Sequence, residues 1–136
     1  MKRDKNLRDL SSDHHHALRL TRKINHAIRD NDNISVLIKQ VREIFDNELS
    51  VHFDLEEKSI LPELEKIGEH KLVKRTLDDH LKLRQLVDKL EEPGNLLMFS
   101  KILKEHVKFE EQELFEACQN KLEPEVMESI GRICNR

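Results

Sequence analysis

Residues that break helices are sparse in this chain, and they divide it into four long segments. The 136 residues include three glycines and three prolines. Convincing breaks occur at DNDN (30–33), at Gly68, at EEPGN (91–95) and at KLEPE (121–125). Charged residues make up 38% of the chain and hydrophobic residues 37%, a balance typical of amphipathic helices rather than of turn-rich β structure. The sequence therefore predicts an all-α protein.

Hydrophobic periodicity places the helices between these breaks. The spacing predicts helices over about residues 12–29, 34–67, 70–90 and 95–121, and then a short C-terminal helix with Pro124 in its first turn. Four helices joined by short turns pack most economically as an up-down-up-down antiparallel four-helix bundle. A chain of this length suits one domain with a sizeable core. We therefore expect a single domain over residues 1–136, with its four-helix core at about residues 12–121.

Single residues carry further expectations about these helices. Ser11 or Ser12 is the expected N-cap of the first helix, and Gly68 is the expected left-handed residue after the second. Pro62 lies inside the second helix and is expected to kink it or to end it early. On the third helix, the periodicity turns Leu77 inward.

Each predicted helix also carries a histidine on its inward line, at His14, His52, His80 and His106. In two antiparallel helices of equal rise, residues at one level are equidistant in sequence from the connecting turn. The midpoint of the first and second histidines is residue 33, inside DNDN. The midpoint of the second and third is residue 66, two residues before Gly68, and that of the third and fourth is residue 93, inside EEPGN. Three independent turn signals thus predict that the four histidines lie at one level.

A short sequence motif occurs twice, as HFDLEE (52–57) and HVKFEE (106–111). Positions i and i+4 share one face of a helix, so Glu56 and Glu110 face inward beside the histidine of each motif. A buried carboxylate needs a partner. Four imidazoles and two carboxylates in an apolar core predict a site for two metal ions, each bound by two histidines, with both glutamates able to bridge them. The candidate ligands are His14, His52, Glu56, His80, His106 and Glu110.

The ligand types narrow the choice of metal. Mixed nitrogen and oxygen ligation without a thiolate disfavours copper(I), and a structural zinc site would have four ligands and no bridge. Iron fits best, and manganese or zinc less well. The Glu-x-x-His motif of ferritin-like carboxylate proteins is absent.

Plainer roles compete with these assignments. A single buried histidine in a helical protein is more often a hydrogen-bonded core residue than a ligand. His15 stays open as an alternative to His14, whereas His26 and His70 lie near helix ends. The second glutamates of the two motifs, Glu57 and Glu111, are expected at solvent-facing edges, and a hydrogen bond to a ligand histidine is their alternative role.

The motifs resemble the hemerythrin-like family, the HHE cation-binding domain, over about residues 10–120. That family places a lone histidine, His-x-x-x-Glu, a lone histidine and His-x-x-x-Glu on successive helices. The corresponding stretches here are SSDHHHAL, HFDLEEKSILPEL, LDDHLKLRQL and HVKFEEQELF. The resemblance implies a di-iron centre held by the six candidate ligands.

Two departures limit what the resemblance implies. Oxygen-carrying hemerythrins have two histidines on the third helix, at i and i+4, but Thr76 and Arg84 stand four residues before and after His80. Six ligands resemble hemerythrin-like iron–sulfur repair proteins, whose N-terminal cysteine-bearing domain has no counterpart in this sequence. Reversible oxygen transport is therefore not expected, and a repair role is an analogy only.

These observations favour a non-heme di-iron protein with an oxo- or hydroxo-bridged centre. We expect it to bind O2, NO or peroxide for sensing, storage or protection. The alternatives are a di-iron enzyme that reduces peroxide or NO, and an iron donor in iron–sulfur repair. The chain contains no tyrosine to supply a phenol, which favours a metal- and gas-binding protein over an enzyme.

Composition argues against several other classes. Net charge is −3, both signs are interspersed, and Trp and Tyr are absent, so neither charge nor stacking favours nucleic-acid binding. No apolar run approaches membrane-spanning length, and the opening MKRDKNLRDLSSD has no signal-like core. Cys118 and Cys134 lack CxxC spacing and are expected as reduced thiols. We therefore expect a cytoplasmic protein; the sequence leaves its oligomeric state and protein partners open.

Overall fold

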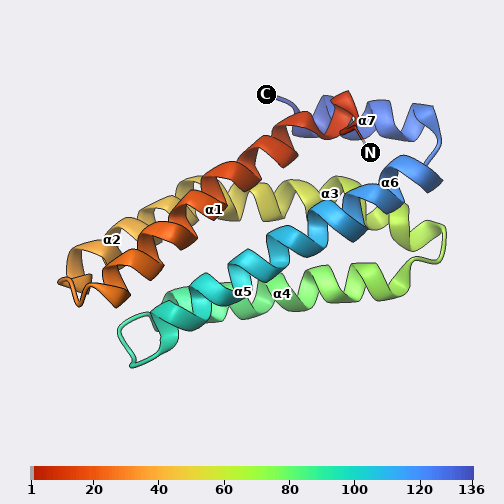
Figure 1. Cartoon of the computed structure of the whole chain (residues 1–136). Coiled ribbons are helices and arrows are strands. Elements are labelled where there is room, and N and C mark those ends of the chain that lie inside the picture. Colours follow the sequence, from red (N-terminus) through yellow and green to blue (C-terminus); the bar gives the residue numbers. More distant parts are fainter. Residues whose placement is uncertain (1) are drawn as a thin grey trace.

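The structure, a computed structural model, describes residues 2–136, and all of its regular elements are helices (Figure 1). The all-α prediction is confirmed, since residues 2–136 contain no strand. The elements in chain order are η1, a 3-10 turn (Lys5–Leu7), α1 (Arg8–Arg29), α2 (Ile34–Ile44), η2, a π-helical turn (Phe45–Leu49), α3 (Ser50–Lys66), α4 (His70–Asp88), α5 (Asn95–Phe109), η3, a second π-helical turn (Glu110–Leu114), α6 (Phe115–Lys121) and α7 (Pro124–Cys134).

These elements make four long rods and one additional helix. The rods are α1, α2–η2–α3, α4 and α5–η3–α6, and consecutive rods run in opposite directions (Figure 1). α1 packs along α5, and α4 packs against both α5 and α3. α7 lies beside the start of α1 and packs against α3 and η1 (Figure 1). This course is compatible with the predicted up-down-up-down arrangement.

The turns between the rods use the residues that the sequence marked as breaks. The Asn33 side chain accepts a hydrogen bond from the Ser35 N–H at 3.0 Å and caps α2. Gly68 follows α3 with a φ of +86°, so the predicted left-handed residue is confirmed. Gly94, with a φ of +84°, precedes α5 in the same conformation.

The expected N-cap of the first helix is wrong, because α1 begins at Arg8 rather than near Ser12. The Asp4 side chain accepts a hydrogen bond from the Asn6 N–H at 2.8 Å and starts a helical turn further upstream. Leu7 and Leu10 are fully buried, so packing holds this extra turn in place.

Two expectations about helix interiors also need correction. α3 continues through Pro62 to Lys66, so of the two expected outcomes, a kink or an early end, the early end does not occur, because the neighbouring leucines and isoleucine are buried and hold the helix together. Leu77 is 43% exposed, whereas Thr76 is fully buried. The Thr76 hydroxyl donates to the Leu72 carbonyl at 2.8 Å, which satisfies its polar group inside the core.

The apolar core consists of two clusters separated along every rod. On α1, Leu10 belongs to one cluster and Ala17 to the other. The same switch occurs on α3, where Phe53 and Ile60 belong to different clusters. His14 lies between the first two positions and Glu56 between the second two, so the fold places buried polar residues of the predicted site where the two apolar clusters meet. No helix in residues 2–136 has the length and apolar character needed to cross a membrane.

Candidate metal centre

The six predicted ligands lie together, and all of them are buried. His14 is 5% exposed, and the other five side chains are at most 2% exposed. They form two overlapping groups whose ligand atoms lie within 4.8 Å of one another. His14 and His52 belong to the first group, His80 and His106 to the second, and both glutamates to each.

Each glutamate presents one oxygen to each histidine pair. Glu56 Oε2 lies 3.0 Å from His52 Nε2, and Glu56 Oε1 lies 3.1 Å from His80 Nε2. Glu110 Oε1 lies 2.8 Å from His14 Nε2 and 3.4 Å from His52 Nε2. Glu110 Oε2 lies 3.0 Å from His106 Nε2 and 3.8 Å from His80 Nε2. Two carboxylates divided in this way can bridge two cations.

Four of these atoms have no hydrogen-bond partner among residues 2–136, although they are buried and close together. They are Glu56 Oε1, His80 Nε2, His106 Nε2 and Glu110 Oε2. A buried polar atom without a partner costs about 1–3 kcal/mol. All four belong to the group around His80 and His106, and a single cation would satisfy them together. The residues present therefore fit a metal ion.

A second carboxylate holds the outer nitrogen of every histidine. The Nδ1–H groups donate to these carboxylates over the following distances: His14 to Glu111, 2.7 Å; His52 to Asp13, 3.0 Å; His80 to Glu57, 2.6 Å; and His106 to Asp79, 2.9 Å. Such a bond fixes the tautomer and turns the Nε2 lone pair toward the centre.

These outer carboxylates form a closed ring around the rods. α1 supplies Asp13 to the histidine of α3, α3 supplies Glu57 to that of α4, and α4 supplies Asp79 to that of α5. η3 closes the ring, because Glu111 returns to His14 of α1. Each rod thus orients the histidine of the next rod.

Sequence reasoning anticipated this ring only in part. Glu57 and Glu111 lie at partly exposed edges, with side chains 26% and 30% exposed, and each also makes the hydrogen bond to a histidine that was its alternative role. Asp13 and Asp79 were missed. Their signal is an acid directly before a lone inward histidine, in SSDHHHAL and LDDHLKLRQL. An acid at that position points sideways toward a neighbouring helix and not toward the histidine that follows it.

The other histidines lie outside the cluster. His15 and His16 are exposed, as are His26 and His70 near the helix ends. The structure therefore turns His14, and not His15, toward the other five side chains. His16 Nδ1 lies 3.4 Å from Glu48 Oε1 at the surface.

The carboxylates raise the pKa values of the buried histidines. Burial alone would lower the pKa of His80, but the nearby carboxylates of Glu110, Glu56 and Glu57 outweigh burial and raise the pKa to about 10. The pKa of His106 is raised to about 9, because the charge of Glu110 and the hydrogen bond to Asp79 outweigh burial. Without a metal these rings hold protons, so a metal must displace protons to bind.

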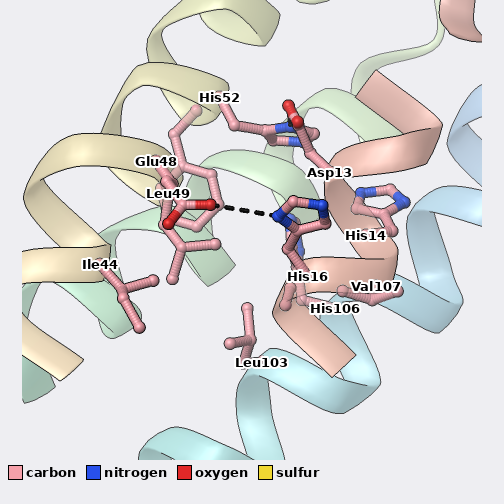
Figure 2. A pocket seen from close by; sticks show the side chains of 12 residues that line it. Asp13, His14, His16, Ile44, Glu48, Leu49, His52, Leu103, His106 and Val107 are labelled. Carbon is pink, nitrogen blue, oxygen red and sulfur yellow. Dashed lines mark hydrogen bonds and ion pairs between the residues drawn. The ribbon is translucent and has the colours of Figure 1, made fainter. Parts of the chain in front are cut away.

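A pocket reaches this centre from the surface between α1, η2 and α5 (Figure 2). The pocket is narrow, because the space in it that a water-sized molecule can occupy is about 20 Å³. His14, His52 and His106 lie at its inner end, and the His16–Glu48 pair lies at its rim (Figure 2). The walls between them are mostly apolar: Ala17, Ile44, Leu49, Phe53, Leu103 and Val107.

A helical scaffold with buried histidines, each held by an outer carboxylate around two shared glutamates, defines a cation-binding helical domain. Residues 5–118 match the hemerythrin HHE cation binding domain. This match covers most of the chain, so the chain belongs to that family, as the sequence motifs indicated. No curated protein and no solved structure matches the chain significantly.

Proposed function

We propose that this chain is a non-heme di-iron protein that binds O2, NO or peroxide for sensing, storage or protection. The observation that carries the proposal is the division of each glutamate between the two histidine pairs. His14 and His52 would hold one iron, His80 and His106 the other, and Glu56 and Glu110 would bridge them. The scaffold in this proposal is a single hemerythrin-like domain, residues 1–136, in which the four rods form an antiparallel bundle and α7 is the C-terminal helix.

The donor set supports iron over other metals. The two groups offer imidazole nitrogens and carboxylate oxygens only, which suits iron and, second, manganese or zinc. The two cysteines are buried free thiols outside both groups. Burial raises the pKa of Cys118 to about 12, so this thiol stays protonated and does not compete as a ligand. Two reduced thiols also support a cytoplasmic location.

The chain controls how a small molecule reaches the centre. When bound, the irons supply Lewis-acid, redox-active positions to which a small ligand can bind. Leu103 and Val107 line the approach and exclude bulk water, while His14 and His52 stand at its inner end (Figure 2). The Thr21 hydroxyl, a candidate proton donor on α1, donates instead to the Leu18 carbonyl at 2.8 Å. A dry approach without a free hydroxyl favours binding over turnover.

A second candidate function is an enzyme that reduces peroxide or NO. The exposed His16–Glu48 pair favours it, because these two titratable groups border the pocket and can exchange protons with solvent (Figure 2). Repeated consumption of peroxide or NO, lost on His16→Ala, would identify an enzyme. A single stoichiometric reaction with each centre would identify a binder.

Metal analysis of the purified protein tests the leading proposal. We expect two irons per chain, with near-ultraviolet absorption from the bridged pair. A protein that holds only zinc, or no metal after anaerobic addition of iron(II), would refute it.

A further inference from the structure

Each outer carboxylate of the centre is in turn held by an arginine. The four contacts are Arg3 Nη2 to Glu111 Oε1 at 3.3 Å, Arg136 Nη2 to Asp13 Oδ1 at 2.6 Å, Arg84 Nη1 to Glu57 Oε2 at 3.0 Å, and Arg75 Nε to Asp79 Oδ2 at 3.0 Å. Every histidine of the centre is therefore the inner end of a histidine–carboxylate–arginine chain.

The four arginines come from different parts of the molecule. Arg75 and Arg84 belong to α4, one of the four rods. Arg3 precedes α1 and Arg136 follows α7. Both of these flanking arginines serve His14 and His52, the pair assigned to one metal. One metal is thus supported by the rods alone, whereas the other depends on the flanking segments as well as on α1, whose Ser11 hydroxyl also donates to Glu111 at 2.9 Å.

The two flanking segments, residues 2–7 and 124–136, are docked to each other, and we call them together the clasp. The Asn135 Nδ2 donates to the Lys5 carbonyl at 3.0 Å, and Figure 1 shows α7 beside the start of the chain. Gly131 of α7 packs so closely that a Cβ there would lie 2.3 Å from Asn6 Oδ1. Displacing one segment therefore disturbs the other, and with it both arginine contacts.

We propose that the clasp makes the metal at His14 and His52 the exchangeable one of the pair, and that this metal in turn holds the clasp docked. The inference rests on the proposed metal centre and adds which metal leaves first and what its loss changes. Flanking segments open at a lower free energy than the packed interior of a fold. Loss of the carboxylate that orients a ligand histidine typically costs 10–100-fold in metal affinity. Because coupling between two sites is reciprocal, the metal must stabilise the clasp by the same factor.

Opening of the clasp would also change the molecular surface. Met127, Ile130 and Cys134 of α7 are buried against the rods and would become exposed. Occupancy of one metal position would then be readable by a partner as an apolar surface, which suits a sensor of metal or of small reactive ligands.

Stepwise removal of iron by a chelator tests the coupling in the loaded wild-type protein. Amide hydrogen exchange follows the clasp while absorbance and metal analysis count the irons. We expect protection of residues 124–134 to fall when the first iron leaves and to change little when the second leaves. Protection that is unchanged by the first loss, or that falls only with the second, would overturn the inference.

Matched variants test the assignment of the two positions. Arg3→Gln with Arg136→Gln should lose one iron 10–100-fold faster than the wild type, with the clasp opened. Arg75→Gln with Arg84→Gln is the control from α4, and it should lose its first iron without opening the clasp. Arg3→Lys with Arg136→Lys should retain iron much better than the glutamine variant, because the positive charge remains. Equal acceleration of both irons in both variants would indicate a merely structural role and refute the proposal.

A substitution remote from the charges gives an independent test. Gly131→Leu places a side chain where that of Asn6 now lies; we expect it to displace α7 and to reproduce the fast loss of one iron while helicity is retained. Full retention of both irons with a demonstrably open clasp would overturn the inference. The proposed function fails separately, if the wild-type protein binds no iron at all.

Discussion

Raising the pH from about 7 to about 9 should destabilise the metal-free protein. His80 is fully buried, and its pKa is raised to about 10 by its carboxylate partners, so the native state keeps its proton over this range. The unfolded chain holds the same imidazole with a pKa of about 6.5 and has released most of the proton. Since the native state binds more protons, its stability falls as the pH rises. The contribution is complete below about pH 6.5 and is lost as the pH approaches 10.

The size of this pH effect on stability follows from the one proton that the native state binds and the unfolded state does not. A difference of one bound proton changes the free energy of unfolding by about 1.4 kcal/mol per pH unit. His80 alone should therefore remove about 2–3 kcal/mol over these two pH units, from the roughly 5–15 kcal/mol that stabilise a typical domain. His106, with its pKa raised to about 9, lowers the free energy of unfolding further, but by less than His80 does, because both rings depend on the same carboxylates, Glu110 and Glu56.

Urea unfolding of the metal-free protein measures this dependence. Circular dichroism at three pH values, at constant ionic strength and with a chelator present, gives the free energies. Glu57→Gln is the matched variant, since it removes the carboxylate 2.6 Å from His80 Nδ1 and should flatten the slope. Iron affinity should show the opposite trend and rise with pH, because ligand histidines must lose their protons. A metal-free stability that stays constant or rises between about pH 7 and pH 9 would refute the reasoning.

Three substitutions extend these tests. Glu110→Ala should abolish iron binding, as measured by metal analysis, yet keep the helical circular dichroism, because the damage is to the bridge; full iron content would show that the ligand set is wrong. Leu103→Phe fills the pocket and should slow NO binding in stopped-flow experiments at least several-fold, at a cost of about 1–3 kcal/mol in stability, whereas unchanged kinetics would place the approach elsewhere. Gly68→Ala should lower the free energy of unfolding by about 1 kcal/mol, because Gly68 has a φ of +86°; an equal or higher midpoint in urea would contradict this.

The rods and the gathering of the six residues could be predicted because each rests on a strong local signal. Asn33 and Gly68 mark turns by their chemistry, and the level of the four histidines follows from the distance to those turns. The π-helical turns escaped prediction, since nothing in FDNEL or EEQEL departs from helical periodicity. Each adds about one residue to its rod, which shifts a helix by about 1.5 Å, less than the reach of an imidazole. The four histidines therefore still meet at one level.

The missed features depend on which rod neighbours which. Asp13 reaches the histidine of α3 and not His14 beside it in sequence. A periodicity argument gives the face of a helix but not the identity of the helix opposite. Leu77 shows the same limit, because residues three and four before His80 lie on nearly the same face. The choice between them was settled by packing, and the smaller Thr76 occupies the buried position.

The structure explains why the repeated motif, HFDLEE and HVKFEE, ends in two successive glutamates. Glu110 and Glu111 contact opposite nitrogens of His14, at 2.8 and 2.7 Å. Residues 56–57 bracket His80 in the same way, at 3.1 and 2.6 Å. Each motif therefore supplies its own histidine, a shared inner carboxylate, and an outer carboxylate for the lone histidine of another rod.

This arrangement relates the two halves of the centre by an approximate twofold symmetry. Asp13 and Asp79, each directly before a lone histidine, complete it by holding His52 and His106. If only these residues mattered, the two metal positions would be equivalent. The symmetry ends at the next contact outward, because Arg136 lies beyond α7 while its counterpart for Asp79 belongs to α4. The proposed metal position at His14 and His52 therefore has a support outside the rods that the proposed position at His80 and His106 lacks, and truncating the flanking segments should make the loss of iron from the first position faster than from the second.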